Sequence, residues 1–229
     1  MQYENYENKI KELDNKFIQA YSCLIPGAGL VADGIANMEN YKTIYPKILW
    51  ILKEPVDQDM SAWSMRDFMN EELKTKYNVK PTWELIIKVS YSLFNNISDF
   101  ENIPSWNSID IQSVSSKIAL INIKKVGGGS KSKDSIIKKY YKNTKTLIKE
   151  QIDLIDPDII FNCSRVHQLF FDIKTEQKTY FPPFCCSKYN NKILINAYHP
   201  AYRTNSSFSH KRYFQLCKQC LSYYSYKYI

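Results

Sequence analysis

Four short segments of the chain are almost continuously apolar, and this feature limits the possible folds more than any other. They read KILWIL at 47–52, KIALINI at 117–123, DIIFNC at 158–163 and KILINA at 192–197. Short apolar runs bounded by polar residues are typical of buried strands. A strand that is apolar on both sides must be covered on both faces, as in a parallel sheet between two helical layers.

Segments with helical periodicity alternate with these strands. The clearest runs from Asp134 to Ile155, where apolar side chains recur every three or four residues and Pro157 follows the end. Further helices are predicted over 6–21, 65–77, 81–94 and 206–224. The sequence therefore predicts an α/β fold, a three-layer α-β-α sandwich with a central, mainly parallel, four-stranded sheet.

The length of 229 residues and the lack of a Gly/Pro/Ser-rich linker favour one domain over 1–229, with 1–45 as a helical extension packed on it. We expect a monomer. No stretch reaches the roughly 18 apolar residues of a membrane span, and the first residues lack a secretory signal, so we expect a cytoplasmic protein with no membrane partner. The six cysteines follow no disulfide framework and are interpreted as reduced thiols.

The charge balance favours a polyanionic partner. Lys and Arg number 31 against 23 Asp and Glu, a net charge of +8, and 18 Tyr, 11 Phe and 4 Trp offer faces on which bases could stack. The competing interpretation is a solvated, Lys-rich surface with no partner.

Polar residues follow three of the apolar runs where a ligand site is expected. Lys53 and Glu54 follow the first run, the second run carries Asn122 near its end and is followed by a triple glycine, and His199 follows the fourth. In an open parallel sheet, ligands bind beyond the carboxyl ends of the strands. Taken singly, these residues are more often a turn, a backbone cap and a structural histidine.

Three of these segments together resemble motifs of the uracil-DNA glycosylase superfamily, in the expected order over about 47–214. Leu52-Lys53-Glu54-Pro55-Val56 resembles the first motif, and Ile121-Asn122 resembles the strand end that carries a base-binding asparagine. Tyr198-His199-Pro200-Ala201 resembles the His-Pro-Ser motif, with Ala201 in place of the serine.

The resemblance implies a DNA glycosylase that flips a nucleotide and hydrolyses the N-glycosidic bond of uracil or a modified pyrimidine. It assigns Glu54 to the attacking water and the positively charged sugar, and a neutral His199 to the departing base. Asn122 and Lys53 would bind the base. Trp63 is the candidate stacking residue, although a core-packing role is at least as compatible with its position.

The resemblance also implies backbone phosphate contacts in the loops after the strands. The residues assigned to DNA binding are Lys124, Lys125, Gly128, Ser130, Lys131 and Arg203, helped by exposed amides of the triple-glycine loop.

Because of Val56, the sequence does not decide which base is the target. The uracil-specific branch has an aromatic residue after the motif proline, and the smaller Val56 implies a roomier pocket. One alternative is therefore a glycosylase for hypermodified, glucosylated hydroxymethylcytosine in anti-phage defence rather than DNA repair. An alternative of another class is a non-catalytic nucleic-acid-binding protein that kept the scaffold.

No cofactor or metal is expected. The four spaced cysteines of the iron-sulfur branch are lacking, and Cys217 and Cys220 fit the buried face of a helix better than a zinc site. A nucleoside triphosphate is not expected either, because Ser130 stands where a phosphate-binding loop needs glycine before Lys131-Ser132.

Overall fold

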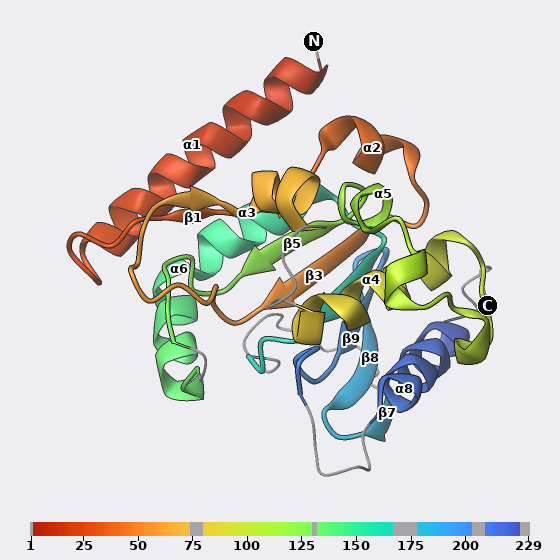
Figure 1. The fold of residues 1–229 in the computed structure, drawn as a ribbon. Coiled ribbons are helices and arrows are strands. Elements are labelled where there is room, and N and C mark those ends of the chain that lie inside the picture. Colours follow the sequence, from red (N-terminus) through yellow and green to blue (C-terminus); the bar gives the residue numbers. More distant parts are fainter. Residues whose placement is uncertain (1, 74–79, 130–131, 167–177, 203–208, 225–229) are drawn as a thin grey trace.

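The computed structural model describes residues 2–73, 80–129, 132–166, 178–202 and 209–224. In these residues the chain forms a mixed α/β fold, with helices on both faces of a central sheet (Figure 1). The sheet order is β2 (Gly34–Ile35), β5 (Ala119–Asn122), β3 (Ile48–Leu52), β6 (Ile159–Asn162), β9 (Lys192–Asn196), β8 (Phe184–Tyr189) and β7 (Lys178–Phe181). A separate parallel pair joins β1 (Val31–Ala32) to β4 (Trp63–Ser64).

The α/β class is confirmed, but the prediction of a four-stranded, mainly parallel sheet is wrong. The four apolar runs do form the strands β3, β5, β6 and β9, which pair in parallel. Three further strands, β2, β7 and β8, pair antiparallel and make the sheet seven-stranded and mixed. Strands β2 and β7 were not predicted because β2 has only two residues and β7 is largely exposed, so neither carries a continuous apolar run.

The helices match the periodic segments in most cases. The α-helices are α1 (Gln2–Ser22), α2 (Met38–Thr43), α3 (Met65–Asp67), α4 (Lys80–Phe94), α5 (Ile111–Ser115), α6 (Asp134–Ile155) and α8 (His210–Tyr223). The predicted helix over 65–77 is α3 followed by a π-helical turn, η1 (Phe68–Glu72), and its last residues lie outside the described part. Short 3-10 turns occupy Phe100–Asn102 and Trp106–Ser108.

Two hydrophobic cores lie on opposite faces of the sheet. Leu49 and Ile51 of β3 point to the core formed with α1 and α6. Trp50, which alternates with them, points to the core formed with α4, α5 and α8, and stacks on Phe161 with 4.3 Å between ring centroids. This alternation explains why the four central strands are apolar at every position.

The N-terminal 45 residues contribute more than the predicted helical extension. Helix α1 packs on α6, and the Lys16 ammonium meets Glu150 at 2.7 Å. The same segment also supplies β2, which pairs with β5 inside the main sheet. Residues 1–45 are thus part of the sheet as well as of one helical layer.

The cysteines lie mostly inside the molecule. Five of the six are buried, including Cys217 and Cys220 on α8 as predicted, and all six are free thiols. Among the described residues, no cluster of His, Cys, Asp and Glu could hold a metal ion. No helix in the described part is long and apolar enough to cross a membrane.

Candidate functional site

The carboxyl ends of the four parallel strands meet at one edge of the sheet. Leu52 of β3 is in register with Asn122 of β5, and Asn162 of β6 is in register with Asn196 of β9. The segments that follow these strands therefore begin side by side. They include the residues that the sequence singled out.

Glu54 is held by an ion pair at this edge. The Lys124 ammonium donates to Glu54 Oε2 at 2.6 Å and to the carbonyl oxygen of Gly127 at 2.8 Å. Both side chains of the pair are only 7% exposed. A carboxylate in such a place costs free energy unless a partner compensates for the lost water, and Lys124 is that partner.

Glycines bring the loops after β3 and β5 together. The Gly128 N–H donates to the Pro55 carbonyl at 3.0 Å, and the Asp57 N–H donates to the Gly128 carbonyl at 3.0 Å. A Cβ on Gly128 would lie 2.2 Å from Glu54 Oε2, and one on Gly127 would lie 2.3 Å from the carbonyl oxygen of Asp57. Only glycine permits this approach, so the triple-glycine loop forms one wall around Glu54.

Asn122 presents a buried amide with unused hydrogen-bonding capacity. The residue is 1% exposed, and its Nδ2 donates to no group within the described residues. Its backbone N–H donates to Asp33 Oδ2 at 2.7 Å. A buried donor without a partner is rare in folded proteins and costs free energy, which makes Nδ2 a candidate ligand contact.

Lys125 belongs to a buried polar network rather than to the surface. Its ammonium donates to Asp33 Oδ1 at 2.5 Å and to the Asn122 carbonyl at 3.1 Å. Gln151 of α6 donates to the same Asp33 oxygen at 3.0 Å. Burial lowers the pKa of Lys125, and the charge of Asp33 opposes this shift. The network joins the N-terminal segment to β5 and α6.

His199 lies in the loop after β9 and is neutral at physiological pH. Burial first, and the positive charge of Lys53 second, lower the pKa of His199 from 6.5 to about 4. The Ala201 N–H donates to His199 Nδ1 at 3.2 Å. The neutral ring therefore carries its proton on Nε2, where it can serve as a donor.

Lys53 connects the loop after β3 with α6 and with His199. Its ammonium donates to Asp134 Oδ1 at 2.8 Å, at the first residue of α6. Burial acts to raise the pKa of Asp134, but the hydrogen bond and charge of Lys53 outweigh it and lower that pKa. Lys53 thus stands beside Glu54 in the chain and acts electrostatically on the imidazole.

Trp63 and Val56 lie further out. The Trp63 indole N–H donates to Asp57 Oδ2 at 3.2 Å, and the half-buried ring packs edge-on against Phe68. Val56 is 69% exposed. Trp63 holds the 57–61 loop, and Val56 forms no part of a closed pocket wall. The loop after β9 carries a second aromatic pair, Tyr198 stacked on Tyr202 with 4.1 Å between centroids.

Two of the lysines predicted to contact DNA, Lys124 and Lys125, are buried in the structure. In the described structure the Lys124 ammonium is paired with Glu54 and the Lys125 ammonium with Asp33, so carboxylates of the protein occupy the place that the sequence assigned to phosphates. The Gly128 amide is used by Pro55 and is not an exposed anion contact. Ser130, Lys131 and Arg203 lie outside the described residues.

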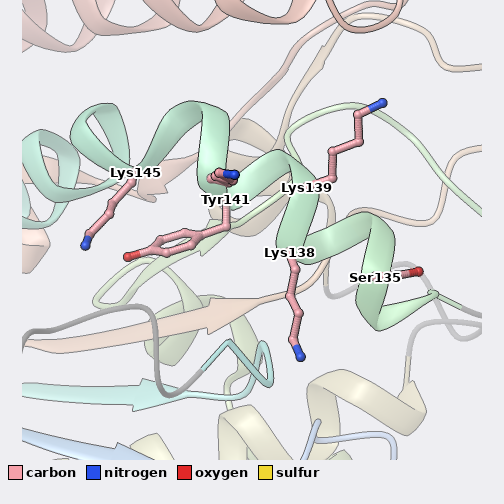
Figure 2. Close-up of a pocket in the computed structure, with 6 residues that line it drawn as sticks. Ser135, Lys138, Lys139, Tyr141 and Lys145 are labelled. Atoms are coloured by element: carbon pink, nitrogen blue, oxygen red, sulfur yellow. The ribbon is translucent and has the colours of Figure 1, made fainter.

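Sequence reasoning missed three features of this region. In the sequence, Asp33 stands only in an unspecific Asp-Gly pair, and Asp134 only at the start of a predicted helix. The third feature is an open hollow of about 510 Å³ on α6 (Figure 2). Its lining residues are Ser135, Lys138, Lys139, Tyr141, Lys142 and Lys145. The sequence does place Lys138 and Lys142 four residues apart, a spacing that puts both side chains on the same face of a helix.

Comparison of the chain with protein-family models and with curated proteins finds no match.

Proposed function

We propose that this protein is a DNA glycosylase that hydrolyses the N-glycosidic bond of uracil or a modified pyrimidine. The observation that carries the proposal is the Glu54 carboxylate, buried at the carboxyl edge of the parallel strands and held by Lys124. In an open sheet with parallel strands, the edge at which Glu54 lies is the place where ligands bind.

The chemistry follows from the charges. Glu54 positions a water molecule and accepts its proton as the water oxygen bonds to C1′ of the sugar. The bond from C1′ to the base nitrogen breaks, and its electron pair leaves with the base. The ionised carboxylate also stabilises the positive charge that develops on the sugar.

His199 and Asn122 serve the base in this proposal. A neutral imidazole with its proton on Nε2 can donate to the anion that develops on the base, and the lowered pKa supports that state. The unpartnered Nδ2 of Asn122 would donate to a carbonyl oxygen of a flipped pyrimidine. The buried amide then gains a hydrogen bond that no group among the described residues gives it.

The decisive experiment is mass spectrometry of bases released from DNA. Oligonucleotides would contain uracil, hypoxanthine, 5-hydroxymethylcytosine or its glucosylated form, and wild type is compared with Glu54→Gln. Because glutamine keeps the shape but loses the charge and basicity, we expect one base to be released by wild type and the rate to fall about 10²–10⁴-fold in the variant.

A matched control separates catalysis from folding. Glu101 also forms an ion pair, with Lys211 at 2.6 Å, but lies on the exposed surface. Glu101→Gln should leave the rate within about twofold of wild type. If Glu54→Gln keeps the wild-type rate with the same melting temperature, the catalytic proposal is wrong.

The buried Glu54–Lys124 pair also favours a second candidate, a non-catalytic nucleic-acid-binding protein in which the pair only braces the two loops. In that case wild type releases no base from any of the four DNAs, while DNA binding persists in Glu54→Gln. Release of the glucosylated base alone would instead support the anti-phage alternative.

A further inference from the structure

Four lysines form a stripe along α6. Lys138, Lys142, Lys145 and Lys149 are spaced by four, three and four residues. At about 100° per residue these positions fall within an arc of roughly 60° on the helix. Lys138, Lys142 and Lys145 also line the open hollow of about 510 Å³, whose side chains Figure 2 shows. We call these four residues the lysine stripe.

The stripe carries positive charge that the described structure leaves largely uncompensated. No carboxylate of the described residues lies within 4.0 Å of the ammonium groups of Lys142, Lys145 or Lys149. By contrast, Glu150, on the flank of α6 that faces α1, is paired with Lys16. The charge of the stripe is therefore available to a partner.

The stripe begins close to the candidate site. Asp134, one turn before Lys138, accepts a hydrogen bond from Lys53, which precedes Glu54 in the chain. From Lys138 to Lys149 the helix rises about 16 Å. One strand of B-form DNA carries about five phosphates over that length of helix axis. A strand that leaves the site along α6 would meet the four ammonium groups in turn.

We propose that the lysine stripe binds the phosphate backbone of the DNA whose base enters the site. This inference rests on the proposed function and deepens it by naming the path of the strand. Nucleic acid fits better than a membrane surface, because the apolar face of α6 is buried in the protein core and cannot enter a bilayer. The exposed Ile136 lies on a different side of the helix from the stripe.

The test compares two triple variants by fluorescence anisotropy with labelled single-stranded and duplex oligonucleotides. Lys138, Lys142 and Lys145 are changed to Gln in one. Lys9, Lys11 and Lys178, exposed on α1 and β7, are changed to Gln in the other. Both lower the formal net charge from +8 to +5. We expect the stripe variant to weaken binding about 10- to 100-fold near 50 mM salt, and to reduce the slope of log K against log salt by about 2 to 3.

Three outcomes would overturn the inference. Equal weakening in both variants would mean that net charge alone matters. Unchanged affinity in the stripe variant would exclude phosphate contacts on α6. Loss of binding to phosphatidylserine vesicles, with oligonucleotide binding intact, would assign the stripe to a membrane.

Parallel base-release assays keep this test separate from the test of catalysis. If wild type releases no base but the stripe variant still loses DNA affinity, the proposed glycosylase function fails and the phosphate contacts remain. If base release depends on Glu54 but the stripe variant binds DNA like wild type, the proposed glycosylase function stands and the phosphate contacts of the lysine stripe are excluded.

Discussion

Lys125 and His199 are two buried nitrogen bases at the same edge of the sheet, and charges of opposite sign lie next to them. Burial disfavours the charged form of both Lys125 and His199 and lowers both pKa values. Lys125 has the Asp33 carboxylate at 2.5 Å, which compensates the charge of the ammonium. His199 faces the positive charge of Lys53, which adds to the effect of burial. The same edge of the sheet thus holds one compensated cation and one neutral donor.

The first prediction concerns the pH dependence of stability through His199. Its folded-state pKa of about 4 lies below the usual 6.5, so between these values the unfolded chain binds a proton that the folded protein does not. The free energy of unfolding should therefore fall as pH falls through this window, by about 1.4 kcal/mol per pH unit from this residue. Urea unfolding at pH 7.0 and pH 5.0 measures the change.

His199→Gln is the control, because it removes the titrating group. The difference in unfolding free energy between pH 7.0 and pH 5.0 should be smaller in the variant. Base release by wild type should stay independent of His199 protonation above about pH 5 and decline below about pH 4. An equal pH dependence of stability in both proteins would contradict the lowered pKa.

The second prediction concerns the buried Lys125–Asp33 pair. Lys125→Met should lower the free energy of unfolding by about 3–5 kcal/mol, because it leaves the Asp33 carboxylate buried without its main partner. Adding Asp33→Asn should recover part of the loss. Urea unfolding of the single and double variants checks this. A loss below 1 kcal/mol in the single variant would place Lys125 outside the buried network.

At the scale of elements, the site depends on two loops that pair with each other. Val56 and Gly128 form an isolated parallel bridge between the segments after β3 and β5. Helix α6 is joined to this arrangement at its first residue through Asp134 and Lys53. The paired strands fix where the two loops begin. The loops carry Glu54 and the glycines that enclose it.

The third prediction tests this close approach with neighbouring glycines. In Gly128→Ala the new Cβ would lie 2.2 Å from Glu54 Oε2, so the carboxylate must move. We expect the rate of base release to fall about 100-fold, the effect of a displacement near 1 Å. Gly129→Ala is the matched control, because a Cβ there meets no atom within 4 Å. Similar rates in the two variants would show that Glu54 tolerates displacement.

For the whole molecule, what matters is how the net charge of +8 is distributed. Two of the lysines that the sequence assigns to DNA, Lys124 and Lys125, are buried in ion pairs. The lysine stripe of α6, in which Lys138 and Lys142 are exposed and Lys145 and Lys149 are half-buried, begins near the candidate site. In the proposal made above, the electrostatic attraction for DNA comes from the lysine stripe on α6 rather than from Lys124 and Lys125.

The fourth prediction is a thermal shift on DNA binding. Glu54→Gln, mixed with substrate duplex at about 100 times its dissociation constant, should gain roughly 2.7 kcal/mol of stability. For a chain of 229 residues this corresponds to a rise of about 5–10 °C in melting temperature. Differential scanning fluorimetry at 50 mM and 500 mM salt measures it. A shift that is equally large at high salt would argue against phosphate contacts.

The sequence by itself determined the four parallel strands and the position of α6. Strands covered on both faces must be apolar throughout, and α6 shows its buried stripe at helical spacing with Pro157 beyond its end. The antiparallel strands β2, β7 and β8 were not predictable in this way. Their pairing is decided by neighbours in space, and their own side chains carry no continuous pattern.

In the candidate site, too, some features can be predicted from the sequence and others depend on tertiary packing. Glu54 and His199 follow strands and Asn122 ends one, so their place at one edge of the sheet can be read from the sequence, because position at the end of a parallel strand is a local property. The sequence does not show which lysine pairs with which carboxylate. Lys124 meets Glu54 across 70 positions, and its neighbour Lys125 meets Asp33 across 92. Adjacent lysines look alike in sequence, and only packing directs one ammonium to the Glu54 loop and the other into the buried network.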